Sequence, residues 1–285
     1  MSPRPSVAVI TDSSCDLPPE IASAHDIIVL PFTIRIDGKE YRDQVDLDTD
    51  QFMHRMVESE SLPTILPPSV QAFQHAFLDA AETHTEILCI VSSSKLSGSF
   101  DAANAAAMHL AKNSHVEIVD SLNTTYGLGF QALRAANLAA SGANARDIAV
   151  TLNAELNRYH VVFFVEALDH LRRGGHIGKA ATMVGSFLQL RPLLRIDEGQ
   201  IVPYERTRTR SKAMDTLAEF AGSTGIPEEI AVIYNSTPED AMEVAGNAGA
   251  LTPDREVVVA QLGPVITTHI GPDVLGMVIK ERLGD

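Results

Sequence analysis

The sequence CIVSSSKLSGS, at residues 89–99, decides the fold. It overlaps an apolar run at 87–91 that predicts a buried strand, and it ends in hydroxyl side chains and a glycine. An alanine-rich segment at 100–112 then predicts a helix. In open α/β sheets, ligands bind beyond the carboxyl ends of strands, where helix N-termini expose unpaired N–H groups. Because such a helix end favours an anion, this stretch predicts where a negatively charged ligand binds.

Outward from this stretch, strand-like and helix-like segments alternate through the first half of the chain. Apolar runs at 7–10, 27–36, 87–91 and 116–119 predict strands, and Pro31 predicts an edge or a bulge in the second run. Helices are predicted to begin near Pro18, Asp48 or Thr49, Ser69, Gly127 and Asn144. This alternation predicts a largely parallel sheet flanked by helices.

The pattern changes near residue 161. We expect an N-terminal α/β domain at 1–160 and a second, α+β domain at 161–285. Strands are predicted at 161–165, 230–234 and 257–261, and helices at 180–190, 211–221 and 238–248. The sequence DEGQ at 197–200 separates two apolar runs and predicts a β-hairpin.

The composition limits the classes of partner. The 285 residues carry a formal net charge of −15, which argues against nucleic acid as a partner because phosphate neutralisation needs a basic face. The two cysteines, Cys15 and Cys89, are expected to be buried free thiols in a reducing compartment. The sequence has neither a signal-peptide pattern nor an apolar run of membrane-spanning length, so a cytoplasmic location is expected.

The serine-rich loop has two interpretations. Ser93, Ser94 and Ser97 could bind the head group of a ligand, or the serines could simply cap the following helix, a position that serine favours. Asp12 and Asp120, at the ends of two other predicted strands, could likewise face a ligand or only form turns.

A second candidate lies near the C-terminal end. Two Gly-Pro pairs, at 263–264 and 271–272, bracket Thr268 and His269. We expect a rigid loop that presents the imidazole, which can donate a hydrogen bond to an anion. The alternative is a structural or solvated histidine.

Nucleotide, hydrolase and metal signatures are missing. The segment 171–179 is glycine-rich, but Arg173 and Ala180 occupy positions where a phosphate loop needs Gly and Ser or Thr. The serines lack the leading glycine of a nucleophile elbow. The ten histidines are scattered without ligand spacing, so neither a metal nor a cofactor is expected.

A cluster of cations interrupts this acidic chain. Arg206, Arg208, Arg210 and Lys212 lie within seven residues. The cluster could be a solvated helix start, or it could dock an acidic partner or a lipid surface.

These segments together resemble the DegV family. The matching motifs are TDSSCDLP at 11–18, SSKLSGS at 93–99, DS at 120–121 with GLG at 127–129, LRRGG at 171–175, and GPV at 263–265 with His269 and GP at 271–272. They occur in family order across nearly the whole chain, which makes the resemblance specific.

The resemblance implies two α/β domains that hold one long-chain fatty acid in a tunnel between them. Family members act as the fatty-acid-binding component of a bacterial fatty acid kinase. A separate ATP-binding subunit phosphorylates the presented carboxylate, and the acyl phosphate enters phospholipid synthesis. The binding component is then not itself an enzyme and has no ATP site, in agreement with the missing phosphate loop.

Site residues follow from the same resemblance. The carboxylate is expected to meet Thr64, Ser93 or Ser94, and His269, with Ser97 and Thr268 beside them. Arg172 or Arg173 is expected near the head-group end. Arg208, flanked by Arg206 and Arg210, falls where the family keeps an arginine linked to kinase docking, and transient contact with a membrane surface is also expected.

The chain departs from the family pattern at three places. The family's TSQP is Thr64-Ile65-Leu66-Pro67 here, His176 replaces the arginine of GGRI, and Asp273 follows the GP pair in place of glycine. Asp273 adds a negative charge that is unfavourable near a carboxylate unless it points away. Two other functions stay open at this point: a serine-dependent acyl hydrolase or transferase, and a sensor or scaffold that lipid only stabilises.

Overall fold

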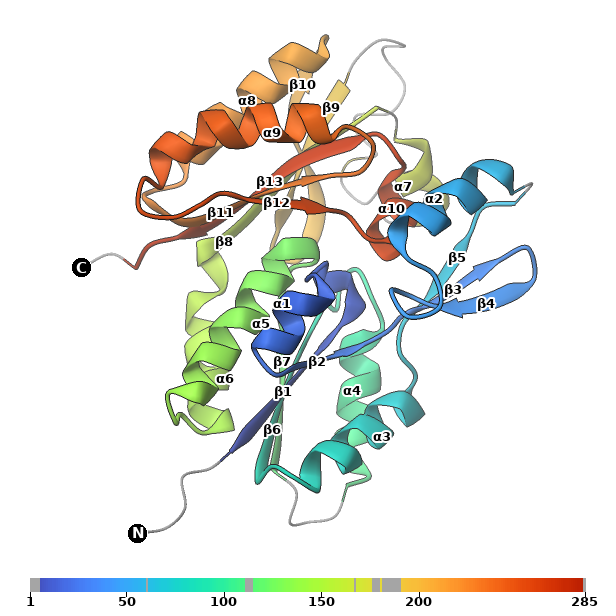
Figure 1. The fold of residues 1–285 in the computed structure, drawn as a ribbon, viewed down its shortest axis with the longest axis vertical. Helices are drawn as coiled ribbons and strands as arrows, with labels where there is room; N and C mark the ends of the chain where they lie inside the picture. Colours follow the sequence, from blue (N-terminus) through green and yellow to red (C-terminus); the bar gives the residue numbers. More distant parts are fainter. Residues whose placement is uncertain are drawn as a thin grey trace. The chain divides into compact units, whose positions relative to one another are not determined.

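The structure is a computed structural model that describes residues 6–59, 61–110, 115–166, 168–175, 180 and 191–283 (Figure 1). The chain forms two compact units. Unit 1 comprises Met1–Leu47 and Thr64–Leu156, and unit 2 comprises Asp48–Pro63 and Asn157–Asp285. This division differs from the single boundary expected at residue 160, chiefly because Asp48–Pro63 belongs with unit 2.

Unit 1 is built on a four-stranded sheet in the order β2-β1-β6-β7, and every pairing in it is parallel. The strands are β1 (Val7–Asp12), β2 (Ile27–Leu30), β6 (Glu86–Val91) and β7 (His115–Asp120). The helices are α1 (Pro19–Ala24), α3 (Val70–Ala81), α4 (Ser99–Met108), α5 (Thr125–Ala140) and α6 (Ala145–Glu155). The predicted parallel sheet flanked by helices is confirmed.

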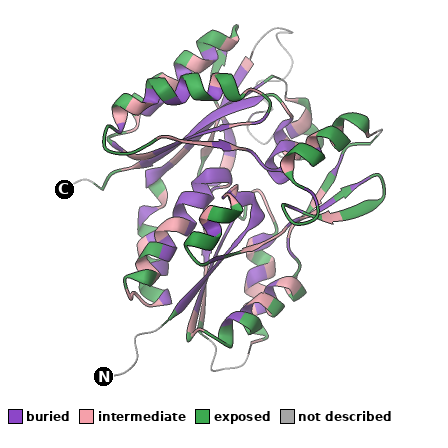
Figure 2. Ribbon diagram, viewed as in Figure 1, coloured by how far each residue is buried: buried purple, intermediate pink, exposed green. Residues whose placement is uncertain are grey.

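The two faces of this sheet are covered by different helices. Ile10 and Cys89 pack in one cluster with Phe73 and Phe77 of α3 and with Ala103 of α4. Helices α5 and α6 lie on the other side of the sheet (Figure 1). The two central strands, β1 and β6, are buried on both faces (Figure 2), which explains why they are continuous apolar runs in the sequence.

A small antiparallel sheet in unit 1 was not predicted. The apolar run at 27–36 is not one strand, because Pro31 and Phe32 separate β2 from β3 (Thr33–Ile36). Strand β3 pairs with β4 (Lys39–Arg42) on one side and with β5 (Thr64–Leu66) on the other. A proline lacks the N–H that a central strand donates, so the run divides between two sheets.

Three predicted helix starts are confirmed by their caps. The Asp48 carboxylate accepts the amide of Gln51 at the start of α2 (Thr49–Glu58), and the Ser69 hydroxyl accepts an amide of α3. The Asn144 side chain accepts the amide of Asp147 in α6. Each cap satisfies a donor that the helix itself leaves unpaired.

Unit 2 contains a six-stranded mixed sheet in the order β10-β9-β8-β13-β11-β12. Only the β11–β12 pairing is parallel among these described strands. The strands are β8 (Tyr159–Val165), β9 (Arg191–Asp197), β10 (Gln200–Thr207), β11 (Pro227–Tyr234), β12 (Val258–Gln261) and β13 (Val274–Glu281). The β9–β10 hairpin is confirmed, and its turn residues Glu198 and Gly199 have φ of 47° and 78°.

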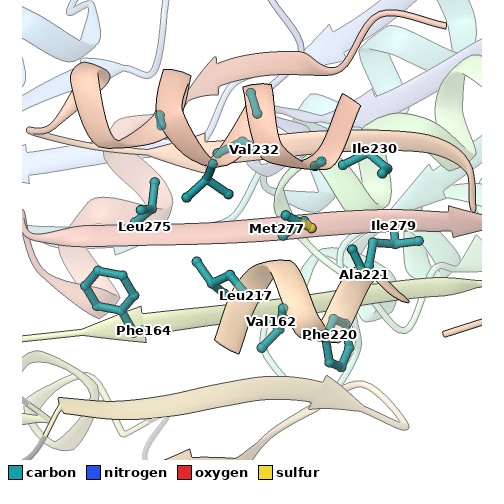
Figure 3. Packing of buried hydrophobic residues seen from close by; sticks show 14 of the residues in the cluster. Val162, Phe164, Leu217, Phe220, Ala221, Ile230, Val232, Leu275, Met277 and Ile279 are labelled. Atoms are coloured by element: carbon teal, nitrogen blue, oxygen red, sulfur yellow. The ribbon is translucent and has the colours of Figure 1, made fainter. Parts of the chain in front are cut away.

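One face of this sheet carries helices α8 (Arg210–Ser223) and α9 (Pro238–Ala248). Their apolar side chains pack on β8, β11 and β13 in one buried cluster (Figure 3). Phe164, Leu217, Val232 and Met277, from four different elements, are all fully buried in it. Burial of each such side chain stabilises the fold by about 1.5–3 kcal/mol.

The segment with two Gly-Pro pairs is a helix rather than the expected loop. Pro264 is the first residue of α10 (Pro264–Ile270), and Gly271 follows it with φ of 92°. A proline is tolerated at the first helical position, where its missing N–H would have no partner. The remaining helix is α7 (Asp169–Arg173). The helix predicted at 180–190 lies almost entirely outside the described residues.

Candidate ligand site

Asp12 lies where the strand order of unit 1 reverses. Strand β1 pairs with β2 on one side and β6 on the other, and ligands in open α/β sheets bind at such a point. Here Asp12 is 0% exposed. Its carboxylate accepts the amide and hydroxyl of Ser14 at 3.2 and 2.6 Å, and those of Ser92 at 3.0 and 2.8 Å. Asp12 thus joins the ends of two strands and leaves no lone pair for a ligand, which supports the structural interpretation.

A second buried carboxyl adjoins this network. The Ser13 hydroxyl donates to Asp43 Oδ2 at 2.6 Å and accepts the amide of Phe32 at 3.0 Å. Burial raises the pKa of Asp43 to about 7; the bond from Ser13 opposes the shift and the charge of Asp12 adds to it. The carboxyl end of β1 is therefore closed by polar contacts within the protein.

The backbone of the serine-rich loop is already hydrogen bonded. The Ser93 amide donates to the carbonyl of Asn123 at 2.8 Å, and the Ser94 amide donates to Asp120 Oδ1 at 3.2 Å. The amides of Lys95, Leu96 and Ser97 all donate to Ser93, at 2.9–3.2 Å. The amides of residues 92–97 therefore all have partners within the protein, so any ligand contact by this loop must come from its side chains.

The loop hydroxyls differ in their availability. Ser93 is 0% exposed and its Oγ accepts the Lys95 amide. The Ser97 and Ser99 hydroxyls are 3.0 Å apart. Ser94 is exposed, and within the described part of the chain its hydroxyl has no hydrogen bond. Of the predicted loop residues, Ser94 is therefore the best placed to contact a ligand.

Thr64 belongs to the same unit as this loop. It is the first residue of β5, stands opposite Arg35 of β3 and is exposed. Three residues later, Pro67 lies close to Gly98, where an added Cβ would be 3.6 Å from Pro67 Cγ. The link after Thr64 and the serine-rich loop therefore lie together in unit 1.

His269 lies in the last turn of α10, in unit 2, and is half-buried. The Thr268 hydroxyl donates to the Pro264 carbonyl at 2.8 Å, so only its lone pairs remain for other contacts. The Asn235 side chain donates to the Gly271 carbonyl at 2.8 Å and fixes the end of the helix. Asp273 accepts the Ser236 hydroxyl at 2.9 Å, which holds this carboxylate against its own unit.

Arg172 and Arg173 lie on the neighbouring helix α7 and are exposed. Arg172 pairs with Asp169 at 3.2 Å. A Cβ added at Gly271 would be 3.0 Å from the ring of His170, so α7 and the end of α10 are in contact. Unit 2 therefore brings these arginines close to the helix that carries His269.

The three predicted docking arginines have different surroundings. Arg206 and Arg208 are exposed. The Arg210 guanidinium is engaged by Asp240, by the Thr237 hydroxyl at 2.6 Å and by Glu166 at 3.3 Å. It also stacks 5.1 Å from the centroid of the Phe164 ring. Arg210 therefore has a structural role within unit 2.

The described residues also bear on metal binding and on cysteine reactivity. They contain no group of three or more His, Cys, Asp or Glu that could hold a metal ion. Burial raises the pKa of both the Cys15 and Cys89 thiols, which makes them poor nucleophiles. No helix in the described part of the chain is long and apolar enough to cross a membrane.

Sequence reasoning missed two residues near the loop that matter to its geometry. Asp120, for which the sequence left a ligand contact or a turn as alternatives, accepts the Ser94 amide and so fixes the loop backbone. Thr125, at the start of α5, has a buried hydroxyl that finds no hydrogen-bond partner among the described residues. The sequence signal for Asp120 was that the two strands on either side of β6, namely β1 and β7, both end in aspartate.

Comparison with known proteins identifies the family. Residues 6–282 match the family model described as an uncharacterised protein of the DegV family. The chain belongs to the DegV family.

Three solved structures are similar to this chain over almost its whole length. DegV from Bacillus subtilis, a fatty acid binding protein, is 31% identical with a TM-score of 0.90, over 98% of this chain and 100% of that one. A fatty-acid-binding DegV family protein from Thermus thermophilus is 27% identical with a TM-score of 0.88, over 97% and 100%. A stearic-acid-binding protein from Eubacterium ventriosum is 25% identical with a TM-score of 0.85, over 96% and 98%.

Proposed function

We propose that this protein binds one long-chain fatty acid. The observation that carries the proposal is the similarity, over 96–98% of the chain, to relatives described as fatty-acid-binding proteins. Transfer of an acyl chain of about 16 carbons from water contributes roughly 12 kcal/mol before the costs of binding, at about 0.8 kcal/mol per methylene. The tail then supplies most of the affinity, and polar residues set the position of the head group.

The carboxylate is bound, in this proposal, by Thr64 and Ser94, with His269 as a further donor. Exposure of Thr64 and Ser94, and the unbonded hydroxyl of Ser94, support these assignments. Ser93 and Ser97 shape the loop, Thr268 holds helix α10 through its bond to the Pro264 carbonyl, and Arg172 or Arg173 supplies positive charge. Without donors, a buried carboxylate would be unfavourable by several kcal/mol.

The bound acid is presented to a separate ATP-dependent kinase subunit. A carboxylate oxygen attacks the terminal phosphorus of ATP held by that subunit, which yields an acyl phosphate and ADP for phospholipid synthesis. Exposed Arg206 and Arg208 dock the subunit or, transiently, an anionic membrane surface. Arg210 supports this surface from within, because its guanidinium is bound to Asp240 and Thr237.

Native mass spectrometry of the purified protein tests the binding step. We expect a mass excess equal to one fatty acid, which organic extraction removes intact and without base treatment. A protein that carries no extractable lipid and takes up none when fatty acid is added would refute the proposal. An ester-linked acyl group that survives extraction and maps to Ser93, Ser94 or Ser97 would favour a hydrolase or transferase instead.

The presentation step has its own test. Thr64→Ala, Ser94→Ala and His269→Ala are expected to retain bound fatty acid and to lose phosphoryl transfer when the kinase subunit is supplied. Loss of lipid from His269→Ala, with normal turnover of whatever complex remains, would contradict the assignment of His269.

A further inference from the structure

The N-termini of two helices in unit 1 differ in their suitability for an anion. Helix α4 has Asp101 in its first turn, and the loop before it uses its amides internally. Helix α5 is 16 residues long, has no acidic residue in its first turn and has no side-chain cap. Because a helix N-terminus carries about half a positive charge, α5 is the better of the two for a negative group.

Thr125 provides an independent indication at the same helix end. It is the first residue of α5 and is 2% exposed. Its Oγ1 is buried, and within the described residues it has no hydrogen-bond partner. A buried hydroxyl without a partner is unfavourable, so such a group indicates that a ligand or water completes it. The neighbouring Thr124 hydroxyl is used elsewhere, donating to the Ser14 carbonyl at 3.4 Å.

The start of α5 adjoins the serine-rich loop. Asn123, two residues before Thr125, accepts the Ser93 amide at 2.8 Å. Asp120 accepts the Ser94 amide at 3.2 Å and the Leu122 amide at 3.0 Å through the same oxygen, Oδ1. The segment that leads into α5 and the backbone of the serine-rich loop are therefore joined by hydrogen bonds within unit 1.

We propose that the N-terminus of α5, through the Thr125 hydroxyl, binds a carboxylate head group, an assignment that rests on the proposed fatty-acid binding. The hydroxyl donates to one carboxylate oxygen, and the helix N-terminus stabilises its charge. Ser94 contacts the same group from the neighbouring loop. The serine-rich loop thus shapes the site, while α5 supplies the favourable electrostatic field.

Thr125→Val tests this assignment, because valine keeps the shape and β-branching of threonine and removes only the hydroxyl. Thr11→Val is a matched control, since Thr11 in β1 is 0% exposed and its hydroxyl also has no partner. Delipidated proteins are titrated with palmitate labelled with ¹³C at the carboxyl carbon. The carboxyl resonance, the affinity and the midpoint of thermal unfolding are measured.

Both valine variants are expected to be at least as stable as the wild type without palmitate. Thr125→Val is expected to shift the bound carboxyl resonance and to weaken binding about tenfold, as loss of a hydrogen bond to a charged group does. Thr11→Val and Thr125→Ser are expected to match the wild type in both measurements.

Two results would overturn the inference. One is a bound carboxyl resonance that is the same in Thr125→Val and the wild type. The other is failure of both Thr125→Val and Thr125→Gly to fold, because a hydroxyl without a protein partner is not needed for folding. Absence of palmitate binding by the wild type is a different result, and it would overturn the proposed function itself.

Discussion

The two units stabilise their buried charges in different ways. In unit 1, Asp12 and Asp43 are 0% and 1% exposed, and their hydrogen-bond donors are hydroxyls and amides such as those of Ser14 and Ser92. In unit 2, buried Lys280 lies 2.6 Å from Glu229 and 3.2 Å from Glu228. At these sites unit 1 solvates the carboxyls with dipoles, whereas unit 2 pairs Lys280 with opposite charge; elsewhere in unit 1, buried Glu155 does pair with Arg134, at 2.9 Å.

This difference reverses the direction of the pKa shifts. Burial raises the pKa of Asp43 to about 7, since the hydrogen bonds from the Ser13 hydroxyl and the Gln44 amide do not compensate for lost water. Burial also acts to raise the pKa of Glu228, but the charges of Lys280 and Arg158 outweigh it and leave that pKa below its usual value. The units should therefore respond oppositely to pH.

Asp12→Asn should lower the free energy of unfolding more than any other substitution that tests this comparison. An amide has one acceptor oxygen, so its NH₂ group would face donors that now bind a carboxylate oxygen. We expect a loss of about 3 kcal/mol or more in the free energy of unfolding, measured by urea denaturation. Exposed Asp79→Asn is the control and should change it by less than about 0.5 kcal/mol. Equal effects of the two variants would show that the Asp12 network is not stabilising.

Lys280→Met should be next, with a loss of about 3 kcal/mol at pH 8. It removes the buried cation from Glu228 and Glu229 and leaves them with Arg158 and the half-exposed Arg255 as partners. The loss should shrink at pH 4, where carboxylates begin to accept protons. Adding Glu229→Gln should recover part of the stability, and a double-mutant cycle measures that coupling. Strictly additive effects would argue against an ion pair.

Asp43 should make a moderate, pH-dependent contribution to the free energy of unfolding. The folded carboxyl keeps its proton up to a pKa of about 7, whereas the unfolded one loses it near 3.8. Its contribution to stability is therefore complete below about pH 4 and is lost as the pH rises towards 7, by about 1 kcal/mol per pH unit. Asp43→Asn should remove this slope in unfolding experiments from pH 4 to 8. An unchanged slope in the variant would assign it to another group.

The smallest effects on stability should distinguish Arg210 from Arg208 in the proposed docking surface. Arg210→Ala should lower the free energy of unfolding by about 1–2 kcal/mol, because it leaves Asp240 and the Thr237 hydroxyl without their partner. Arg208→Ala should leave the free energy of unfolding unchanged within about 0.5 kcal/mol and weaken only the proposed association with a kinase subunit. Comparable destabilisation by both substitutions would contradict the structural role given to Arg210.

Local sequence patterns, namely apolar runs and helix-capping side chains, predicted much of the fold. The strands of the parallel sheet are continuous apolar runs, and helix starts such as Asp48 and Ser69 carry capping side chains. Strand β13 was missed because Gly276 interrupts its pattern. A Cβ there would lie 2.7 Å from the Val162 carbonyl, so only close packing of β8 and β13 explains the glycine.

The candidate site was less predictable for a different reason. The types of side chain are visible in the sequence, but the use of each donor depends on distant residues. Asp12 and Ser92 are 80 positions apart, and Ser94 and Asp120 are 26 apart. The same Gly-Pro pairs fit a rigid loop or a short helix such as α10, because proline starts helices as readily as it stiffens loops.

Asp48–Pro63 has a consequence for dissecting the protein. This segment is flanked on both sides by unit 1, yet it belongs to unit 2, where Asp50 accepts a bond from Gln261 at 3.4 Å. Neither unit is one continuous segment of the polypeptide chain. A fragment that ends at Leu156 would carry helix α2 with its buried Phe52 but without the rest of unit 2, and the complementary fragment would lack that helix. We therefore expect unit 1 to be complete once Leu156 has been synthesised. Helix α2, although it is made earlier, must wait for the residues after Asn157 before it can pack in unit 2.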